Sequence, residues 1–375
     1  DNMSFFIGDD GKKYRIFGEG GVKKTAEEFQ KEFLGEIPID SEVGKCGDIG
    51  KPIVEYNPTH KISKVYLDFA EKIKKSYLWF MNYKNFENIL ITGARGNSAY
   101  FFLRELEKKN IESKISVISR DKSKNKYFDQ FKLNLKIFNG DINENNFLKS
   151  CLHNIDTVLH TANMENSERV LKEVGSNVKW VLLVHSTMIY SKNLSSFIKN
   201  RIRIDKEILS KNKNVTILRP TMIYGNERDI NFSRLIKFMI NFRFMPVFGS
   251  GNNLIQPIHI QDLSKAYFDV IEYKEKTFGK SYNLSGKNYL KYIDALKFIT
   301  KIINKKIILI KIPISLGKLI VKLMQILFFG NFPINVSQIE RQSENKNIDY
   351  YDAKKDFNFS PRSFEEGIAK QIEKY

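Results

Sequence analysis

The sequence predicts an α/β protein built on a doubly wound parallel sheet, with a smaller C-terminal α/β part and a short N-terminal appendage. Three observations support this fold class. Short apolar runs alternate with helical segments from Asn88 onward, a glycine-rich turn follows the first run, and the charge balance changes near residue 58. The chain has 375 residues, 42% hydrophobic and 28% charged, which suits two or three globular domains.

Six apolar runs are the predicted strands of the sheet. Runs that are apolar throughout indicate strands buried on both faces, and helical segments between most of them indicate parallel connections. The first helix is expected at about 98–109. The strands are expected at Ile89–Thr92, Ile115–Ser119, Leu135–Phe138, Thr157–His160, Trp180–Val184 and Val215–Leu218.

The chain after Pro220 is mixed in character. Its most apolar stretch, 306–329, is interrupted by Pro313 and three lysines, so the roughly twenty consecutive apolar residues of a membrane span are never reached. We expect a core or interfacial amphipathic helix there, which allows peripheral contact with a membrane surface. The other predicted elements are helices at 232–241, 261–273 and 292–303 and a loop at 246–251.

The N-terminal appendage differs in charge from the rest. Residues 1–58 carry 8 basic and 12 acidic side chains, whereas residues 59–375 carry 53 and 31. A segment of this size buries only a small core. We expect a helix at 23–33 and a strand at 33–39 within it. The expected parts are 1–60, a connector helix over 61–86, a sheet domain over 87–225 to which 253–290 contributes, and a C-terminal part over 226–375.

A formal charge of +18 raises nucleic acid or an anionic membrane as partners. The lysines are scattered along the chain, and no basic motif is interleaved with aromatics, so no nucleic acid is expected. Cys46 and Cys151 are too few for a disulfide framework or a cysteine zinc site, and no metal site is expected. Acids and glycines in the first twenty residues argue against a signal peptide. These observations predict a cytoplasmic protein.

A glycine turn after the first strand carries a chemical prediction. Gly93, Gly96 and Ala99 give a tight turn, a close backbone approach and a small residue for helix packing, as a Rossmann dinucleotide fingerprint requires. An ordinary strand-to-helix turn is the alternative, and the five strands that follow favour the fingerprint. Backbone N–H groups at the helix start would then face a pyrophosphate. The turn residues expected to bind are Gly93, Ala94, Arg95, Gly96, Asn97 and Ser98.

The residues after the second strand bear on the choice between NAD and NADP. An acid there accepts the ribose 2′-hydroxyl of NAD, whereas a base suits the 2′-phosphate of NADP. The sequence has Ser119-Arg120-Asp121. Arg120 favours NADP slightly, while Asp121 keeps NAD open.

From Asn88 to the C-terminus, six short motifs occur in a fixed order over some 170 residues. They are Thr92-Gly-Ala-Arg-Gly96, Gly140-Asp-Ile142, His160-Thr-Ala162, Ser186-Thr-Met-Ile-Tyr190, Leu218-Arg-Pro-Thr-Met-Ile-Tyr-Gly225 and Pro257-Ile-His-Ile-Gln-Asp262. With them the chain resembles the extended and atypical short-chain dehydrogenase/reductases, of the NAD-dependent epimerase/dehydratase type.

The resemblance implies roles for several residues. Asp141 and Ile142 would lie near the adenine, and Thr161 and Ala162 would line the cofactor. The chain at Pro220 and Thr221 would run past the nicotinamide ring. It also implies that Asp262 caps a helix beside a pocket for a nucleotide-linked sugar, and it permits a homodimer. We expect His160 and His259 to be structural.

The catalytic Tyr-x-x-x-Lys of the family is altered here. Its best placed equivalent is Phe197-Ile-Lys-Asn-Arg201, in which Phe has no proton to give and Arg does not titrate. Ser186 matches the substrate-orienting Ser, and Arg201 could hold ribose hydroxyls. The position of Tyr190 is structural in the family, and its hydroxyl makes it the less favoured candidate for a substitute acid. The candidate catalytic residues are therefore Ser186, Tyr190 and Arg201.

Residues 1–60 resemble the C-terminal end of Mrp-type iron–sulfur carrier ATPases, relatives of ParA and MinD. The matching segments are Asn2–Phe6, Ile16–Gly21, Phe33–Asp40 and Gly47–Ile53. No G-x-x-x-x-G-K-[ST] loop occurs in the sequence, and Gly8 and Gly11 stand where many carriers have Cys-x-x-Cys. We expect a truncated fusion or a gene-boundary product rather than a working carrier.

These observations lead to one functional prediction with two rivals. The first is an NAD(P)-binding oxidoreductase or epimerase/dehydratase that acts on a nucleotide-sugar-like substrate through bound nicotinamide. The second is a non-catalytic NADP-binding module, a redox sensor or structural subunit, which the altered tetrad favours. The third is iron–sulfur cluster delivery, which would have to rest on residues 1–60.

Overall fold

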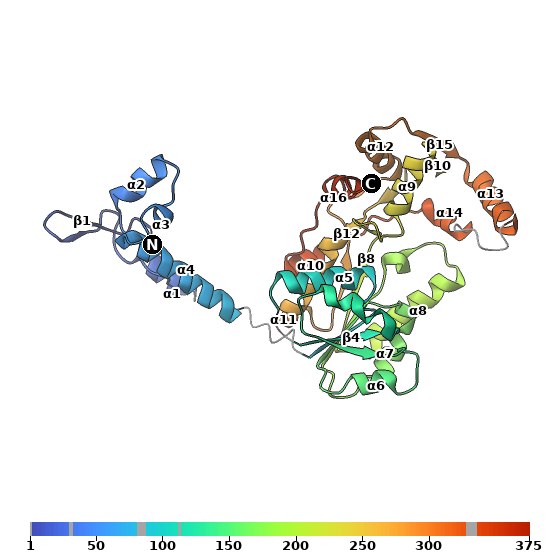
Figure 1. Cartoon of the computed structure of the whole chain (residues 1–375), viewed down its shortest axis with the longest axis horizontal. Coiled ribbons are helices and arrows are strands. Elements are labelled where there is room, and N and C mark those ends of the chain that lie inside the picture. The colour runs from blue at the N-terminus through green and yellow to red at the C-terminus, as the bar shows by residue number, and fades with distance from the viewer. Residues whose placement is uncertain (1, 30–32, 81–87, 112–113, 328–335) are drawn as a thin grey trace. The chain divides into compact units, whose positions relative to one another are not determined.

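The computed structural model describes residues 2–29, 33–80, 88–111, 114–327 and 336–375, with the side chains of 73–80 left undescribed. The chain forms two compact units, Asp1–Asn82 and Tyr83–Tyr375 (Figure 1). We describe each unit by itself.

The N-terminal unit has a short hairpin, a few helices and a small core. Its core joins Cys46 and Ile53 to Ile62 on the last helix, so that helix packs within this unit and covers the described part of the predicted connector. The strand expected at 33–39 is reduced to a parallel bridge between Asn2 and Ile37. The elements are β1 (Phe6–Ile7), β2 (Lys13–Tyr14), α1 (Gly21–Glu28), α2 (Ser41–Asp48), α3 (Ile53–Tyr56) and α4 (Lys61–Phe80).

The second unit is organised around a seven-stranded sheet of order β13-β8-β7-β6-β3-β4-β5, all parallel. The predicted fold class is confirmed, and all six predicted runs are strands. The seventh strand comes from the later segment expected to contribute. The strands are β3 (Ile89–Thr92), β4 (Ile115–Ser119), β5 (Leu135–Asn139), β6 (Thr157–His160), β7 (Trp180–Val184), β8 (Val215–Pro220) and β13 (Ser281–Leu284).

Helices cover both faces of this sheet and form two hydrophobic clusters. One cluster contains α5 (Asn97–Lys108) and α10 (Ile260–Glu272), and the other contains residues of α6 (Phe147–Cys151), α7 (Ser167–Glu173) and α8 (Ser196–Lys211). The strand order reverses direction between β3 and β6, whose ends at Thr92 and His160 are paired. In sheets of this type ligands bind in the crevice at that switch point.

A C-terminal lobe adds a third cluster (Figure 1). The expected loop at 246–251 is wrong in part, because Phe244–Phe248 is strand β10, paired in parallel with β15. The single helix expected within 306–329 is also wrong: β15 (Ile308–Ile312) ends at Pro313 and α13 (Ile314–Leu327) follows. The other helices of the unit are α9 (Phe232–Phe242), α11 (Lys274–Thr277), α12 (Tyr292–Ile303), α14 (Val336–Gln342), α15 (Tyr351–Phe357) and α16 (Phe364–Ile372).

Four short strands complete the second unit: β9 (Ile223–Tyr224), β11 (Leu254–Ile255), β12 (Ile258–His259) and β14 (Leu290–Lys291). Short 3-10 segments follow β4, β6 and β7; the last of them, η4, is Thr187–Tyr190. Within the described ranges, no helix combines the length and apolar character needed to cross a bilayer.

Candidate functional site

The turn between β3 and α5 can be built only with glycine at its first position. Gly93 has φ +71°, and a Cβ there would lie 2.7 Å from the backbone nitrogen of Ala162. The Gly96 N–H donates to the Gly93 carbonyl at 2.8 Å, which closes the turn. The glycine turn is therefore in close backbone contact with Ala162, in the segment that follows β6.

The N-terminus of α5 is open to an anion. Gly96 is its N-cap, is exposed and offers no capping side chain, and the first turn carries no acid. The first N–H groups of a helix lack partners within it and form the positive end of its dipole. The Oδ1 of Asn97 is also buried without a hydrogen-bond partner among the described residues. These features fit a bound pyrophosphate.

His160 and Thr161 tie β6 to β3 beneath this turn. The Thr161 hydroxyl donates to the Thr92 carbonyl at 2.8 Å. His160 Nε2 donates to the Asn163 carbonyl at 3.0 Å, so its Nδ1 accepts from the Thr92 hydroxyl at 2.6 Å. Burial lowers the pKa of His160 to about 4. His160 is therefore neutral, and both of its ring nitrogens form hydrogen bonds. This agrees with the structural role that we expected for it.

Arg120, which follows β4, lies close to Asp141, which follows β5. Arg120 is exposed, with its Nη1 4.0 Å from Asp141 Oδ2. The Asp121 carboxylate instead accepts from the hydroxyl and N–H of Ser123 and pairs with Lys124, which lowers its pKa to about 2. Asp121 is thus engaged in its own turn, while Arg120 remains on the surface.

The candidate catalytic residues Ser186 and Tyr190 follow β7 but face different partners. Ser186 caps η4 by accepting the Met188 N–H at 3.2 Å. The Tyr190 hydroxyl donates to Asn283 Oδ1 at 3.0 Å and lies 3.5 Å from Arg219 Nη1. Since Asn283 belongs to β13, Tyr190 reaches toward the far end of the sheet, beyond β8.

Phe197 and Arg201 lie one turn apart on α8 and contact each other. The Arg201 guanidinium carbon lies 4.3 Å from the centre of the Phe197 ring. Its Nε donates to Glu165 Oε1 at 2.8 Å, while Glu165 Oε2 is buried and has no partner among the described residues. Glu165 follows the β6 segment that the turn contacts. The described contacts of Arg201 therefore do not join it to Tyr190.

A buried polar chain next to these residues was missed by sequence reasoning. The Asp205 carboxylate accepts from His185 Nδ1 at 2.7 Å and from Arg219 at 3.0 and 2.7 Å, and the Ser167 hydroxyl lies 3.1 Å from His185 Nε2. Although burial opposes ionisation, the hydrogen bonds from His185 and Arg219 hold the pKa of Asp205 below its usual value. Ser167 is fully buried, so this Ser-His-Asp arrangement braces the sheet rather than meeting a substrate.

The motif around His259 has roles that differ from those expected. His259, not Asp262, caps α10, because its Nδ1 accepts the Gln261 N–H at 3.3 Å. Asp262 instead pairs with Arg362 of the C-terminal segment at 2.9 Å. The prediction of an Asp262 cap was wrong because a buried histidine one residue before the helix takes that position. Burial also lowers the pKa of His259 to about 3.

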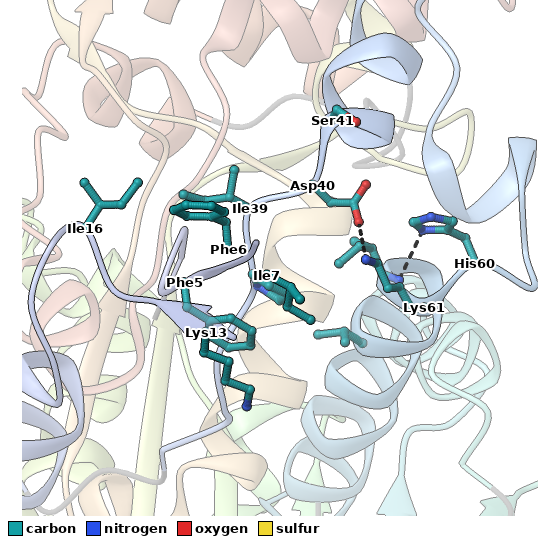
Figure 2. Close-up of a pocket in the computed structure, with 13 residues that line it drawn as sticks. Phe5, Phe6, Ile7, Lys13, Ile16, Ile39, Asp40, Ser41, His60 and Lys61 are labelled. Atoms are coloured by element: carbon teal, nitrogen blue, oxygen red, sulfur yellow. Dashed lines mark hydrogen bonds and ion pairs between the residues drawn. The ribbon is translucent and has the colours of Figure 1, made fainter. Parts of the chain in front are cut away.

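The N-terminal unit has a hollow of about 760 Å³ (Figure 2). Its lining is largely apolar, including Phe5 and Ile39, and Asp40 at its rim pairs with Lys61 at 3.1 Å. Within the described part of the chain, no group of three His, Cys, Asp or Glu side chains could hold a metal ion.

Comparison of the sequence with known proteins finds relatives of the N-terminal unit. Residues 1–74 match the family model for the ParA-type NUBPL iron-transfer P-loop NTPase. The iron–sulfur cluster carrier protein of Saccharolobus solfataricus is 42% identical over 76 residues, 20% of this chain and 26% of the relative. The NUBPL iron–sulfur cluster transfer protein of Dictyostelium discoideum is 34% identical over 89 residues, 24% and 28%. The chain thus spans about a quarter of the length of these relatives.

Comparison with solved structures shows the fold of the larger unit. The UDP-glucuronic acid 4-epimerase of Bacillus cereus, solved with UDP-glucuronic acid and NAD, has a TM-score of 0.60 at 18% identity and covers 76% of this chain and 98% of its own. The dTDP-glucose 4,6-dehydratase of Bacillus anthracis, solved with NAD, has a TM-score of 0.58 at 16% identity and covers 76% and 96%. The two-part resemblance predicted from the sequence is confirmed.

Proposed function

We propose that the second unit binds NAD(P) at the β3–α5 turn and acts as an oxidoreductase or epimerase/dehydratase on a nucleotide-linked sugar. The observation that carries this proposal is the open N-terminus of α5 at the switch point between β3 and β6, with Gly93 pressed against Ala162. Both solved neighbours named above contain NAD, and the Bacillus cereus epimerase also contains UDP-glucuronic acid, which supports the same class of ligand for this chain.

In this proposal the cofactor residues divide by position along the crevice. The N–H groups of the turn, including Arg95 and Ser98, hold the pyrophosphate, and Asp141 with Ile142 holds the adenine end. Thr161 and Ala162 line the middle, while Pro220 and Thr221 border the nicotinamide. We favour NADP over NAD, because Arg120 is exposed whereas the Asp121 carboxylate is engaged by Ser123 and Lys124.

A bound nicotinamide supplies hydride exchange with a carbon of the substrate. The chain's own residues must orient the sugar and move the proton of the reacting hydroxyl. A side chain positioned beside that hydroxyl usually does this in general acid–base catalysis. Ser186 carries the hydroxyl that we assign to orienting the sugar, and Arg201 holds ribose hydroxyls. Tyr190 is the alternative proton donor, which its bond to Asn283 Oδ1 disfavours. Glu165 fixes Arg201 through the 2.8 Å contact.

The second candidate is a non-catalytic NADP-binding module. One observation favours it: the guanidinium of Arg201 is occupied by Glu165 and Phe197, so no titrating cation stands beside a phenol at the usual tetrad. The relatives of the N-terminal unit are named as iron–sulfur cluster carriers, and they are about four times as long as the segment that matches this chain. We therefore do not assign cluster delivery to this chain.

The experiment that tests the proposal is identification of the nucleotide that copurifies with the chain, followed by calorimetric titration with NAD and with NADP. We expect a 1:1 complex with a preference for NADP, and the Arg120→Ala variant should lose that preference while still binding NAD. Absence of binding to either nucleotide would refute the proposal. Binding without turnover on any UDP- or dTDP-sugar would favour the non-catalytic module.

A further inference from the structure

Helix α13 presents an apolar stripe to the outside of the C-terminal lobe. Gly317 and Val321 are buried on its inner side. The outward residues are spaced at helical intervals along one side, as in an amphipathic helix turned toward an apolar partner. They are Leu316, Leu319, Ile320, Leu323, Ile326 and Leu327, with exposed fractions between 39% and 73%.

The inner side of α13 packs on the two-stranded sheet β10–β15. A Cβ on Gly317 would lie 2.5 Å from the Phe248 ring, so α13 rests on the end of this sheet. Phe244 pairs with Ile308 in that sheet, and these two side chains are 37% and 58% exposed. We call the stripe together with Phe244, Ile308 and Ile310 the lobe face. Figure 1 shows α13 at the outer rim of the lobe.

Lysines outnumber acids around the lobe face, where Glu340 pairs with Lys318 of α13 at 2.6 Å. No Asp or Glu occurs between Asp294 and Glu340, a stretch that contains seven lysines, nor between Asp229 and Asp262. Lys322 lies between Leu319 and Ile326 on the helix surface, and Lys305 and Lys306 directly precede β15. Among the described residues, no acid forms an ion pair with any of these three lysines.

We propose that the lobe face docks on an anionic phospholipid surface. The apolar side chains would enter the boundary between headgroups and acyl chains, and the lysines would meet the lipid phosphates. The 14 described residues of α13 are fewer than the roughly 20 that a bilayer span needs. A second copy of the chain would bring two lysine-rich faces together, and a nucleic acid would leave the apolar stripe uncovered, so both fit less well.

The test is cosedimentation of the full chain with vesicles of phosphatidylcholine, with and without phosphatidylglycerol. We expect binding to the anionic vesicles only, weakening as salt is raised. Leu323→Glu should weaken this binding by about tenfold or more, because it places a charge in the stripe. Leu67→Glu is the matched control: Leu67 is 49% exposed on α4, Leu323 is 51% exposed, and the control should bind like the parent.

Lysine variants provide a second readout. Lys305→Gln with Lys306→Gln and Lys322→Gln should reduce the salt-dependent part of the vesicle affinity by about fivefold for each charge removed. Lys318 is left in place because it pairs with Glu340 at 2.6 Å, and Glu340 also accepts from Asn193.

Three results would overturn the proposal. The chain could remain in the supernatant with anionic vesicles at about 0.15 M salt. Leu323→Glu could bind vesicles as tightly as Leu67→Glu. The chain could be a dimer that Leu323→Glu converts to a monomer, without vesicle binding, which would make the lobe face an interface between copies. Vesicle binding lost selectively in Leu323→Glu would support it, whatever the result of nucleotide titration.

Discussion

Arg201 and Glu165 form an ion pair in which Arg201 Nε lies 2.8 Å from Glu165 Oε1, and the same guanidinium covers the ring of Phe197. One turn of α8 thereby places an aromatic ring and a cation together, where we align the family's Tyr and Lys. The Phe ring has no hydroxyl, and the Arg side chain is already held by a carboxylate. In our alignment, Phe197 and Arg201 take the two tetrad positions, and neither side chain can donate a proton as a tyrosine does.

The first prediction is that restoring both groups increases hydride chemistry. Phe197→Tyr with Arg201→Lys should raise turnover on a UDP- or dTDP-sugar by about 10²–10⁴-fold, the usual contribution of general acid catalysis. Each single variant should change turnover little, because the phenol needs the cation and the cation needs the phenol. The measurement is steady-state turnover of the three variants. An inactive double variant that still binds cofactor would contradict this role for the tetrad.

Tyr190→Phe separates the two possible acids. The hydroxyl of Tyr190 is bonded to Asn283 Oδ1 at 3.0 Å, toward β13, so we expect its loss to change turnover less than about tenfold. Asn283→Ala is the companion variant, since it removes the acceptor and leaves the phenol. If Tyr190→Phe abolishes activity and the double restoration changes nothing, Tyr190 is the acid and our alignment of Phe197 is wrong.

Stability should depend on pH through His160, together with His259, whose lowered pKa of about 3 acts in the same direction. The pKa of His160 is about 4 in the folded chain, below the ordinary value of about 6.5 for an exposed imidazole. Between these values the unfolded chain binds the extra proton, so stability rises with pH from about 4 to 6.5 and is lost as pH falls through that window. The full effect of His160 is roughly 3 kcal/mol.

Urea unfolding between pH 4 and 7 measures this dependence. His160→Asn cannot titrate and should flatten the curve relative to the parent, although it lowers stability at pH 7 by losing hydrogen bonds. His153→Asn, at an exposed position, is the control and should follow the parent curve. An unchanged slope in His160→Asn would show that His160 does not govern the acid side of stability.

Removal of the N-terminal unit should leave cofactor binding intact. The second unit has its own sheet and clusters, and the cofactor residues all belong to it. A chain lacking residues 1–82 should bind NADP within about threefold of the full chain, a difference below about 0.7 kcal/mol. Titration of both chains under the same conditions checks this, and a large loss would mean that the N-terminal unit contributes to the site.

Most of the sheet could be predicted from the sequence because the central strands β3, β6, β7 and β8 are largely apolar, as burial on both faces requires. Edge strand β13 (Ser-Tyr-Asn-Leu) lacks that signal. Strand β10 could not be predicted, because Pro246 marks a loop in most contexts, yet an edge strand tolerates proline. The Asp205 network also escaped prediction, because its members come from α7, the residue after β7, α8 and β8, and only the folded sheet brings them together. The sequence held one clue to this network. Asp205 lies one helical turn after Arg201 on α8, and Arg219 lies in the Arg-Pro motif at the end of β8, so an acid and a base occur beside residues already singled out.

Titration of NADP into the Gly96→Val variant is the decisive measurement for cofactor binding at the β3–α5 turn. Gly96 has an ordinary φ, and a Cβ there would meet only the Gly93 carbonyl at 3.0 Å, so the fold should survive while a branched side chain blocks the pyrophosphate. Gly175→Val is matched to it, because a Cβ at Gly175 also has one neighbour at 3.0 Å, on Asn177. We predict that Gly96→Val weakens NADP binding about 100-fold or more, roughly 2.7 kcal/mol, with Gly175→Val like the parent. Equal affinity in Gly96→Val and the parent would contradict the account.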